Sequence, residues 1–339
     1  MYDVYGLGNA LVDMEYRVDD SFLRSHGIAK GHMTLVDEAR LDTLVAALKE
    51  YQPERMSGGS AANSMIAIQG FGGRTFYSCR LADDEVGGYF LRDLDEAGIV
   101  TNDNAARPKP RITGQSGQCL VLVTPDAERS MNTFLGISTQ LGTSEIDQAA
   151  LERARFFYAE GYLSSSPDSL AAAVACRELA EDAGVQTAIS LSDPSMVEIF
   201  RDNLVKILGN GVDHLFCNEE EALSWARTDR LDIAVKELKD IGRELNVTLG
   251  SRGSLAVSAH DQALVPGYQV RAVDTNGAGD MYAGACLYGW CAGMSPTQAA
   301  AFGNFAAAQL VQTFGARLRR IGDYASTLKA FKAAPAATG

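Results

Sequence analysis

The seven residues from Asp274 to Asp280, DTNGAGD, combine a glycine-rich turn with a carboxylate at each end. An apolar stretch without charges follows, so we expect a helix to begin in this turn. The first N–H groups of a helix bind anions, and Gly277, Ala278, Gly279 and Asp280 would supply them. A carboxylate at that point repels an anion, but it serves a reaction in which a hydroxyl loses a proton while attacking phosphorus. The pattern therefore predicts phosphoryl transfer with Asp280 as general base; a plain Asp cap, the alternative, explains the glycines less well.

A second glycine-rich turn, SGGSAANS at residues 57–64, precedes another apolar segment. Gly58 and Gly59 let the backbone approach a ligand closely. Ser60 is placed to cap the following helix, and Asn63, one turn further on, can point its amide at the same ligand. Taken alone, this motif fits an ordinary turn with an N-cap at least as well.

Two later motifs each follow an apolar run. In CNEEEALS, Asn218 and Glu221 are one turn apart and would orient a hydrated Mg²⁺, which prefers oxygen ligands and keeps its water. Acids in the first turn of a helix are also favoured by the helix dipole alone. In TLGSRGS, residues 248–254, the glycines and small hydroxyls suit a loop against phosphates or a ribose, or a plain turn between strands.

The segment GLGNAL, residues 6–11, resembles the beginning of a dinucleotide-binding fingerprint. Leu11 stands where the third glycine belongs, and no helical pattern follows it. An NAD-dependent oxidoreductase rests on this fragment alone, and NADH binding would test it. The sequence also has no Walker loop, so a nucleotide would have to be bound by the other glycine-rich turns.

Apolar runs alternate with amphipathic segments along most of the chain, with strands expected at TFYSC, at residues 154–160 and at DHLFC. A helix is expected over residues 167–183, beginning near Ser166 or Asp168. Such alternation predicts a parallel sheet with helices on both faces. Residues 10–36 and 111–137 resemble paired strands instead, and we expect them to form a β lid over the site. The whole would be one domain, residues 1–332, with a disordered tail at 333–339.

Composition narrows the range of partners. The chain has 339 residues and a net charge of −13, and it lacks a basic stripe, which argues against a nucleic acid polymer. The six cysteines form no C-x-x-C pair, and the N-terminus has no basic signal region, so we expect a cytoplasmic protein with reduced thiols. Residues 281–316 carry no charge, but their small and polar residues and the Ser295-Pro296 break predict two packed helices rather than a membrane hairpin.

In their order along the chain, GGSAAN, N-x-x-E and DTNGAGD resemble the ribokinase/phosphofructokinase B family of ATP-dependent kinases of small molecules. The resemblance runs from about Tyr2 to about Tyr324. Within that family, GLGNALVDMEYRVDDSFLRSHGI, TPDAERSMNTFLGIS and ARFFYAEGYL are most similar to adenosine kinases. The resemblance implies a ribokinase-like, three-layer α/β/α Rossmann-like domain with a small β-sheet lid, and an active site in the groove between them.

The resemblance also implies roles for single residues. Asp280 would be the catalytic base, Arg129 would lie near the transferred phosphate, and the anion hole would be Gly277, Ala278 and Gly279. The acceptor would be bound by Asp13, Asn9, Gly58, Gly59, Asn63, Phe134 and Tyr162. ATP would contact Asn218, Thr248, Gly250, Ser251, Gly253 and Asn304. Mg²⁺ would be oriented by Glu221 and, through water, by Asn218, and the carbonyls around Asp274 and Asn276 are the place where K⁺ would bind.

Some positions depart from the adenosine kinase pattern. Met33 stands where that group carries glutamine, and Phe134, Leu135 and Gly136 also differ, whereas Tyr162 is compatible with stacking on a nucleobase. Phosphorylation of adenosine to AMP is therefore the first hypothesis, and a sugar kinase acting on fructose or ribose is the second. A third, of another class, is a non-catalytic sensor of a nucleotide or metabolite. The partners expected are one small molecule and, at most, a second copy of the chain, since the protein would be a monomer or homodimer without a membrane partner.

Overall fold

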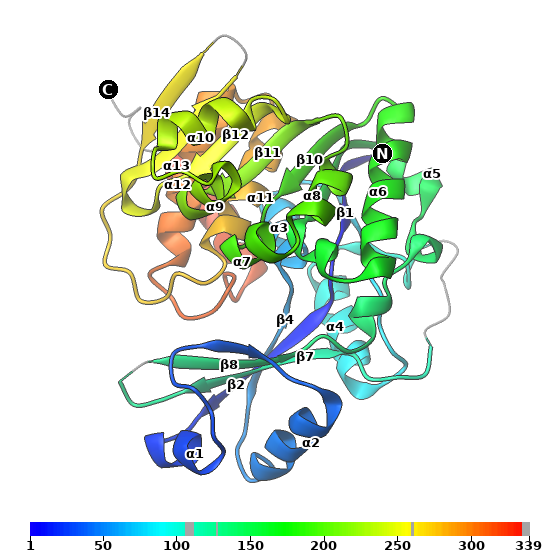
Figure 1. The fold of residues 1–339 in the computed structure, drawn as a ribbon, viewed down its shortest axis with the longest axis vertical. Helices are drawn as coiled ribbons and strands as arrows, with labels where there is room; N and C mark the ends of the chain where they lie inside the picture. The colour runs from blue at the N-terminus through cyan, green and yellow to red at the C-terminus, as the bar shows by residue number, and fades with distance from the viewer. Residues whose placement is uncertain (106–111, 127, 259–260, 334–339) are drawn as a thin grey trace.

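The structure is a computed structural model that describes residues 1–105, 112–126, 128–258 and 261–333 (Figure 1). Its described strands form two sheets. The larger has nine strands in the order β14-β13-β12-β11-β10-β9-β1-β5-β6. Their bounds are β1 (Tyr2–Leu7), β5 (Thr75–Ser78), β6 (Val100–Thr101), β9 (Ala154–Glu160), β10 (Gln186–Ser190), β11 (Val212–Asn218), β12 (Gly242–Thr248), β13 (Gly253–Val257) and β14 (Gln262–Pro266). In this sheet β12, β11, β10, β9, β1, β5 and β6 are parallel to one another. The remaining two strands, β13 and β14, are added antiparallel at the edge next to β12.

Helices cover both faces of the large sheet, which confirms the predicted three-layer α/β fold. One face packs on α3 (Ser60–Gly70), α4 (Glu85–Glu96), α11 (Ala278–Cys291), α12 (Pro296–Leu310) and α13 (Ile321–Ala333). The other face packs on α5 (Gln148–Leu151), α6 (Pro167–Asp182), α7 (Pro194–Ile199), α8 (Arg201–Leu208), α9 (Glu219–Ala226) and α10 (Leu231–Leu238). Neighbouring residues of one strand enter opposite cores, as Val4 and Tyr5 do, because side chains alternate along a strand. Short 3₁₀ helices complete the chain: η1 (Gly136–Gln140), η2 (Thr143–Glu145), η3 (Gly161–Ser165) and η4 (Gly250–Arg252).

The smaller sheet has five strands in the order β3-β8-β7-β2-β4. They are β2 (Leu11–Arg17), β3 (Met33–Leu35), β4 (Glu54–Gly58), β7 (Gly117–Val123) and β8 (Arg129–Phe134). We call this sheet the lid sheet. Its outer face packs on α1 (Asp20–Ser25) and α2 (Glu38–Ala47), and Figure 1 shows both helices on the side away from the large sheet. The strand β4 lies outside the ranges from which the sequence predicted the lid.

Some helices match the bounds expected from the sequence, and others end earlier or divide. Helices α11 and α12 account for the uncharged segment as two helices, as predicted, and among the described residues no helix is both long and apolar enough to cross a bilayer. The segment after Asp193 forms two helices instead of the single one expected, because the chain breaks at Phe200. The predicted helix from Leu231 ends at Leu238, and the following residues enter β12. Ala333 ends α13, and residues 334–339 of the expected tail lie outside the described part.

The order of the strands locates the site. After β1 the chain adds β5 and β6 on one side, and then returns to add β9, β10, β11 and β12 on the other. Open α/β sheets bind ligands beyond the carboxyl ends of the strands at such a switch point. Here that point lies beyond the ends of β1 and β9, next to Asn9 and Glu160.

Candidate active site

The DTNGAGD segment forms the turn into α11, as its pattern predicted. Gly277 is the N-cap in a left-handed conformation (φ 73°), and a Cβ there would lie 1.9 Å from the carbonyl oxygen of Ala316, so only glycine fits. Among the described residues, the N–H groups of Gly277, Gly279 and Asp280 have no hydrogen-bond acceptor. The N–H of Ala278 donates to the carbonyl of Thr275 at 3.3 Å, so three of the four expected amides lack an acceptor in the described part of the chain. Unpaired N–H groups at the start of a helix can donate to an anion, and the helix dipole favours negative charge there.

The Asp280 carboxylate is held by α3. Ser60 Oγ donates to Asp280 Oδ1 at 2.6 Å, and Asn63 Nδ2 donates to Asp280 Oδ2 at 3.0 Å. Ser64 Oγ donates to the Asp280 carbonyl at 3.0 Å, so three side chains of one helix fix this turn of α11. The prediction that Ser60 caps α3 is wrong: Gly59 is the N-cap, at φ 102°, and the Ser60 hydroxyl is used on Asp280 instead.

Two hydrogen-bond acceptors next to Asp280 are free. Asn63 Oδ1 is buried without a partner in the described structure, an arrangement that costs free energy unless a ligand donates to it. The Asp13 carboxylate accepts no hydrogen bond from any described residue, and it lies over Gly58, where a Cβ would be 2.8 Å from Asp13 Oδ2. A ligand with hydroxyl groups would satisfy both acceptors.

Burial makes these acids weaker than usual. It raises the pKa of Asp280 to about 6, opposed by the hydrogen bonds from Ser60 and Asn63. It also raises the pKa of Asp13 to about 6, opposed by the charges of Arg129 and Arg317 and reinforced by that of Asp280. Near neutral pH both are ionised, but each holds a proton more readily than a solvated carboxylate, which suits a general base.

Glu160 is a central residue that the motifs did not reveal. It ends β9 and is 1% exposed; its Oε1 accepts from the N–H of Asn9 at 2.9 Å and its Oε2 from the N–H of Ala61 at 2.6 Å. One carboxylate thereby joins the turn after β1 to the start of α3. Burial raises its pKa to about 7, with the charge of Asp280 contributing. The sequence feature that could have indicated Glu160 is an acid at the end of the apolar run ARFFYAE. Glutamate is rarely fully buried unless its carboxylate is paired.

Arg129 connects the lid sheet to the DTNGAGD turn. Its Nη1 lies 2.5 Å from Asp274 Oδ2, and its Nη2 forms an ion pair with Glu15 on β2. Asp274 Oδ2 also accepts from the N–H of Gly315 at 2.8 Å, and Oδ1 accepts from the N–H of Asn276 at 3.1 Å. Both carboxylate oxygens of Asp274 therefore bond to protein groups. A monovalent cation near Asn276 would have to be coordinated by main-chain carbonyls instead.

A second buried arginine supports the other edge of the lid sheet. Arg317 forms an ion pair with Asp93 of α4, and both bond to the Ser57 hydroxyl of β4. Arg317 is 7% exposed, and its charge lowers the pKa of Asp13. The sequence offered no motif for this cluster, since its members are far apart in the chain.

On the nucleotide side, Asn218 and Glu221 bond to each other as a capping box of α9. Asn218 Oδ1 accepts from the Glu221 N–H at 2.8 Å, and Glu221 Oε2 accepts from the Asn218 N–H at 3.1 Å. Burial raises the pKa of Glu221 to about 7. Sheet register places Asn218 beside Thr248, so two of the expected ATP contacts adjoin. In the described part of the chain no three His, Cys, Asp or Glu side chains cluster as metal ligands. A hydrated Mg²⁺ needs only one or two protein groups, so the predicted role of Asn218 and Glu221 does not require such a cluster.

The TLGSRGS turn connects β12 and β13. Gly250 (φ 60°) and Gly253 (φ 101°) are both in the left-handed region, and a Cβ on Gly253 would lie 2.1 Å from the Val265 carbonyl. Asn304 of α12 donates to the same carbonyl at 3.0 Å, so the fold brings these two predicted residues together. Ser251 is exposed on this turn.

The remaining predicted acceptor residues lie on three different elements. Asn9 is 7% exposed, and its carbonyl accepts from the Tyr77 hydroxyl at 2.8 Å. Tyr162 lies in η3, and burial together with the charges of Asp193 and Asp280 raises its pKa. Phe134 ends β8 and is only partly buried.

The inner face of the lid sheet carries carboxylates toward β4 and mostly apolar side chains toward β3. Strand register aligns one row with Asp13 and the next with Glu15, on the face opposite the buried Val12 and Met14. The first row is Met56, Asp13, Cys119, Thr133 and Leu35; the second is Glu54, Glu15, Val121, Met131 and Met33. Met33 and Leu35 are 51% and 60% exposed, so this end of the face is open.

Comparison with known proteins agrees with this geometry. The model of the "pfkB family carbohydrate kinase" matches residues 29–320. Adenosine kinase 1 of Arabidopsis thaliana is 26% identical over 333 residues, covering 91% of this chain and 94% of the relative, and adenosine kinase of Saccharomyces cerevisiae is 27% identical with the same coverage. The solved adenosine kinase of Sinorhizobium meliloti is 33% identical with a TM-score of 0.86, covering 98% of this chain and 99% of that one. A probable sugar kinase from Rhizobium etli CFN 42 is 30% identical with a TM-score of 0.85, covering 97% and 98%.

These matches span the site from the lid sheet to the DTNGAGD turn. The family transfers phosphate from ATP to a hydroxyl group. The substrate is a small molecule, either a nucleoside or a sugar. This chain therefore belongs to the pfkB family of carbohydrate kinases and is an ATP-dependent kinase.

Proposed function

We propose that the protein transfers the γ-phosphate of ATP to the primary 5′-hydroxyl of a nucleoside, with adenosine as the preferred acceptor and AMP as the product. The observation that carries the proposal is the separation of donors and acceptors around Asp280. In the part of the chain that the structure describes, three unpaired N–H groups lie at the start of α11, and two unpaired acceptors lie on Asp13 of β2 and on Asn63 of α3. An anion fits the first set, and the hydroxyls of a ribose fit the second.

In the proposed reaction, Asp13 and Asn63 Oδ1 accept hydrogen bonds from the ribose hydroxyls and orient the sugar. The 5′-oxygen attacks the γ-phosphorus, its proton passes to Asp280, and the bond from phosphorus to the ADP oxygen breaks. The N–H groups of Gly277, Gly279 and Asp280 stabilise the charge on the phosphoryl oxygens. Arg129, which already reaches Asp274, adds a positive charge from the lid sheet.

Mg²⁺ would be oriented by Glu221 and Asn218 through water, and its charge would offset that of the phosphates. The ATP contacts would be Thr248, Gly250, Ser251, Gly253 and Asn304. A monovalent cation such as K⁺ would lie against the carbonyls of residues 274–276. Residues 10–36, 54–58 and 111–137 would close as a lid and exclude water during transfer.

The mostly apolar β7, β8 and β3 end of the inner face of the lid sheet favours a nucleoside over a free sugar. A purine ring buries a large apolar surface, whereas fructose or ribose has hydroxyls on every side, which Val121, Met131 and Met33 could not satisfy. Tyr162 offers an aromatic ring near the same site. The similarity to solved adenosine kinase of S. meliloti supports the same choice.

The test is ATP consumption in the presence of adenosine, inosine, cytidine, fructose or ribose. The proposal expects the highest kcat/KM with adenosine. A higher value with fructose or ribose would assign the protein to the sugar kinases and refute the nucleoside proposal. A rise in melting temperature with adenosine or ATP, but no product with any acceptor, would instead indicate a sensor.

A further inference from the structure

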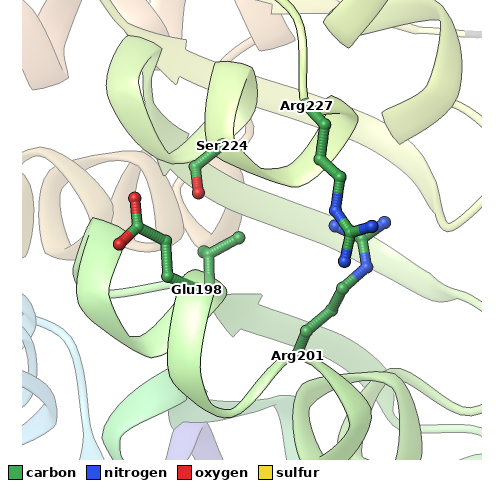
Figure 2. Close-up of a pocket in the computed structure, with 5 residues that line it drawn as sticks. Glu198, Arg201, Ser224 and Arg227 are labelled. Atoms are coloured by element: carbon green, nitrogen blue, oxygen red, sulfur yellow. The ribbon is translucent and has the colours of Figure 1, made fainter.

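A separate pocket lies on the opposite face of the large sheet from α11, between α7, α8 and α9. It has a volume of about 300 Å³ and is lined by Val197, Glu198, Arg201, Ser224 and Arg227. We call it the Arg201–Arg227 pocket. Figure 2 shows Glu198 and Ser224 on one side and the two arginines on the other. Apart from Ser224, the last residue of CNEEEALS, its residues belong to none of the motifs that formed the candidate active site.

The two guanidinium groups lie near each other without a counter-ion. No described carboxylate is within ion-pair distance of Arg201 or Arg227, in a chain whose net charge is −13. The charge of Arg227, after burial, lowers the pKa of Arg201, which reflects their proximity. Arg201 is fixed in place, because Nη1 donates to the Trp225 carbonyl and the guanidinium carbon lies 4.4 Å from the centre of the Trp225 ring. Arg227 is exposed, so solvent screens part of the repulsion between the two charges, and an anion bound between them would reduce it further.

The backbone at Arg227 adds independent support. Arg227 follows α9 in a left-handed conformation (φ 50°, ψ 45°), which normally selects glycine and costs other residues about 1 kcal/mol. Its side chain makes no hydrogen bond or ion pair with the described residues. The exposed side chain of Arg227 lines the pocket, and its guanidinium is available to a ligand there.

The pocket offers uncharged donors as well. The Ser224 hydroxyl has no partner among the described residues. Helix α8 begins at Arg201 without a side-chain cap, and the N–H groups of Arg201 and Asp202 lack acceptors in the described structure. Glu198 lines the pocket, and Asp202 and Glu237 lie close enough to raise the pKa of Arg201, so these three acids limit the affinity for an anion.

We propose that the Arg201–Arg227 pocket binds a phosphate-type oxyanion, either inorganic phosphate or the phosphate group of a small phosphomonoester. Two guanidinium groups and a hydroxyl form the donor set that tetrahedral oxyanions accept from. The volume admits more than the phosphate group alone, and Glu198 on the far side can accept from a hydroxyl of the remainder. The inference does not depend on the acceptor that the kinase uses.

The chain supplies a local reporter for the test. It contains two tryptophans, Trp225 and Trp290, so Trp290→Phe leaves only the ring that lies beside Arg201. Inorganic phosphate is titrated into this full-length variant at constant ionic strength, with chloride in its place as control. The expected result is a saturable change in Trp225 fluorescence with phosphate only. Glycerol 3-phosphate serves as the second arm, and tighter binding than inorganic phosphate would identify a phosphomonoester as the ligand class.

Arg227→Gly, made in the same background, removes one guanidinium and places glycine where the backbone favours it. It should weaken phosphate binding at least about tenfold, the loss of one charge-assisted contact. The matched control is Arg92→Ala on α4, an exposed arginine whose loss changes net charge equally and should leave the affinity unchanged. Glu198→Gln should strengthen binding, since it removes the facing carboxylate.

Two outcomes would overturn the proposal: no saturable signal up to about 20 mM phosphate, a concentration that would bracket ordinary metabolite affinities, or equal affinity in the Arg227→Gly variant. Phosphate bound instead to the amides of Gly277 and Gly279 would persist in that variant, so the two sites are distinguished. Should Trp290→Phe fail to fold, the same comparison is made with both tryptophans present. Phosphate should then raise the melting temperature of the unaltered chain and of Arg92→Ala by more than that of Arg227→Gly, in which only binding at the α11 amides would remain. Equal rises in all three proteins would overturn the proposal.

Discussion

The substitution Asp280→Asn tests whether the carboxylate is needed for catalysis or only for the structure of the site. The present carboxylate accepts from Ser60 Oγ and Asn63 Nδ2. An asparagine keeps one acceptor oxygen for Ser60, and its new amide can donate to Asn63 Oδ1 if the Asn63 amide rotates, because that oxygen has no partner in the described structure. The substitution also removes a buried charge, whose burial raises the pKa of Asp280. The variant should therefore fold with an unchanged or higher melting temperature.

The kinetic effect should be large. Loss of a general base typically reduces turnover by about 10²–10⁴-fold. With a pKa of about 6, Asp280 is mostly ionised at pH 7. Only about a tenth remains ionised at pH 5, so kcat/KM of the unaltered enzyme should fall roughly tenfold over that interval. Asp13 and Glu160 titrate nearby, and the observed acid limb belongs to the group of three carboxylates rather than to one.

The assay is a pH profile of kcat/KM for both proteins, from pH 5 to 8.5, with ATP consumption coupled to product formation and melting temperatures measured in parallel. A variant with near-normal turnover would remove the base role of Asp280. A variant that loses activity only because it unfolds would show a lowered melting temperature, and would count against the hydrogen-bond exchange with Asn63 described above.

The remaining predictions concern residues that position the site. Gly277→Ala should lower both the melting temperature and the activity, because its Cβ would lie 1.9 Å from the Ala316 carbonyl oxygen. Gly279→Ala, whose Cβ meets nothing within 4 Å, should keep the melting temperature and lower the activity alone. Thermal melts and kinetics of both variants test this difference. Glu160→Gln leaves the N–H of Asn9 or Ala61 without its charged hydrogen-bond acceptor, so the KM for the phosphate-accepting substrate should rise. The pH profile of kcat/KM should also lose the titration of Glu160 near pH 7. A change in kcat alone would contradict this prediction. The same variant should lose less stability between pH 4.5 and 7 than the unaltered chain, because a carboxyl whose folded pKa is raised costs stability as pH rises through that window, as pH-dependent unfolding would show. Arg129→Gln leaves Asp274 and Glu15 without their cation, and should reduce kcat at least about tenfold while raising ATP hydrolysis without acceptor; unchanged coupling would exclude a role of the lid sheet in excluding water.

Sequence patterns predicted the layers well, because alternation of apolar runs and amphipathic segments has few solutions other than a parallel sheet covered by helices. They predicted element ends less well. The break at Phe200 and the early end of the helix at Leu238 depend on which residues pack on the sheet, and β4 pairs with β2 only once the lid sheet exists.

The site divides in the same way. DTNGAGD and GGSAAN carry their own turn chemistry, since glycines with positive φ are required at Gly59 and Gly277, and these positions were recognisable. Glu160 and Arg317 act through partners far away in the chain, such as Ala61 and Asp93, and no local pattern marks them. The Ser60 cap failed as a prediction because a tertiary partner, Asp280, competes for the hydroxyl.

A carboxylate beside an anion site is unfavourable in isolation, and the arrangement of hydrogen bonds shows how the protein accommodates it. The donors that hold Asp280 come from α3, while three amides at the start of α11 have no acceptor in the described part of the chain and remain available to another ligand. The charge of Asp280 and that of a phosphate would repel each other across this gap unless a hydroxyl proton lay between them. Binding of the acceptor therefore supplies the group that makes binding of the phosphate favourable. It follows that ATP and acceptor should bind with positive coupling, that Asp280→Asn should weaken the coupling, and that the coupling should fade below pH 6 as Asp280 takes up its proton.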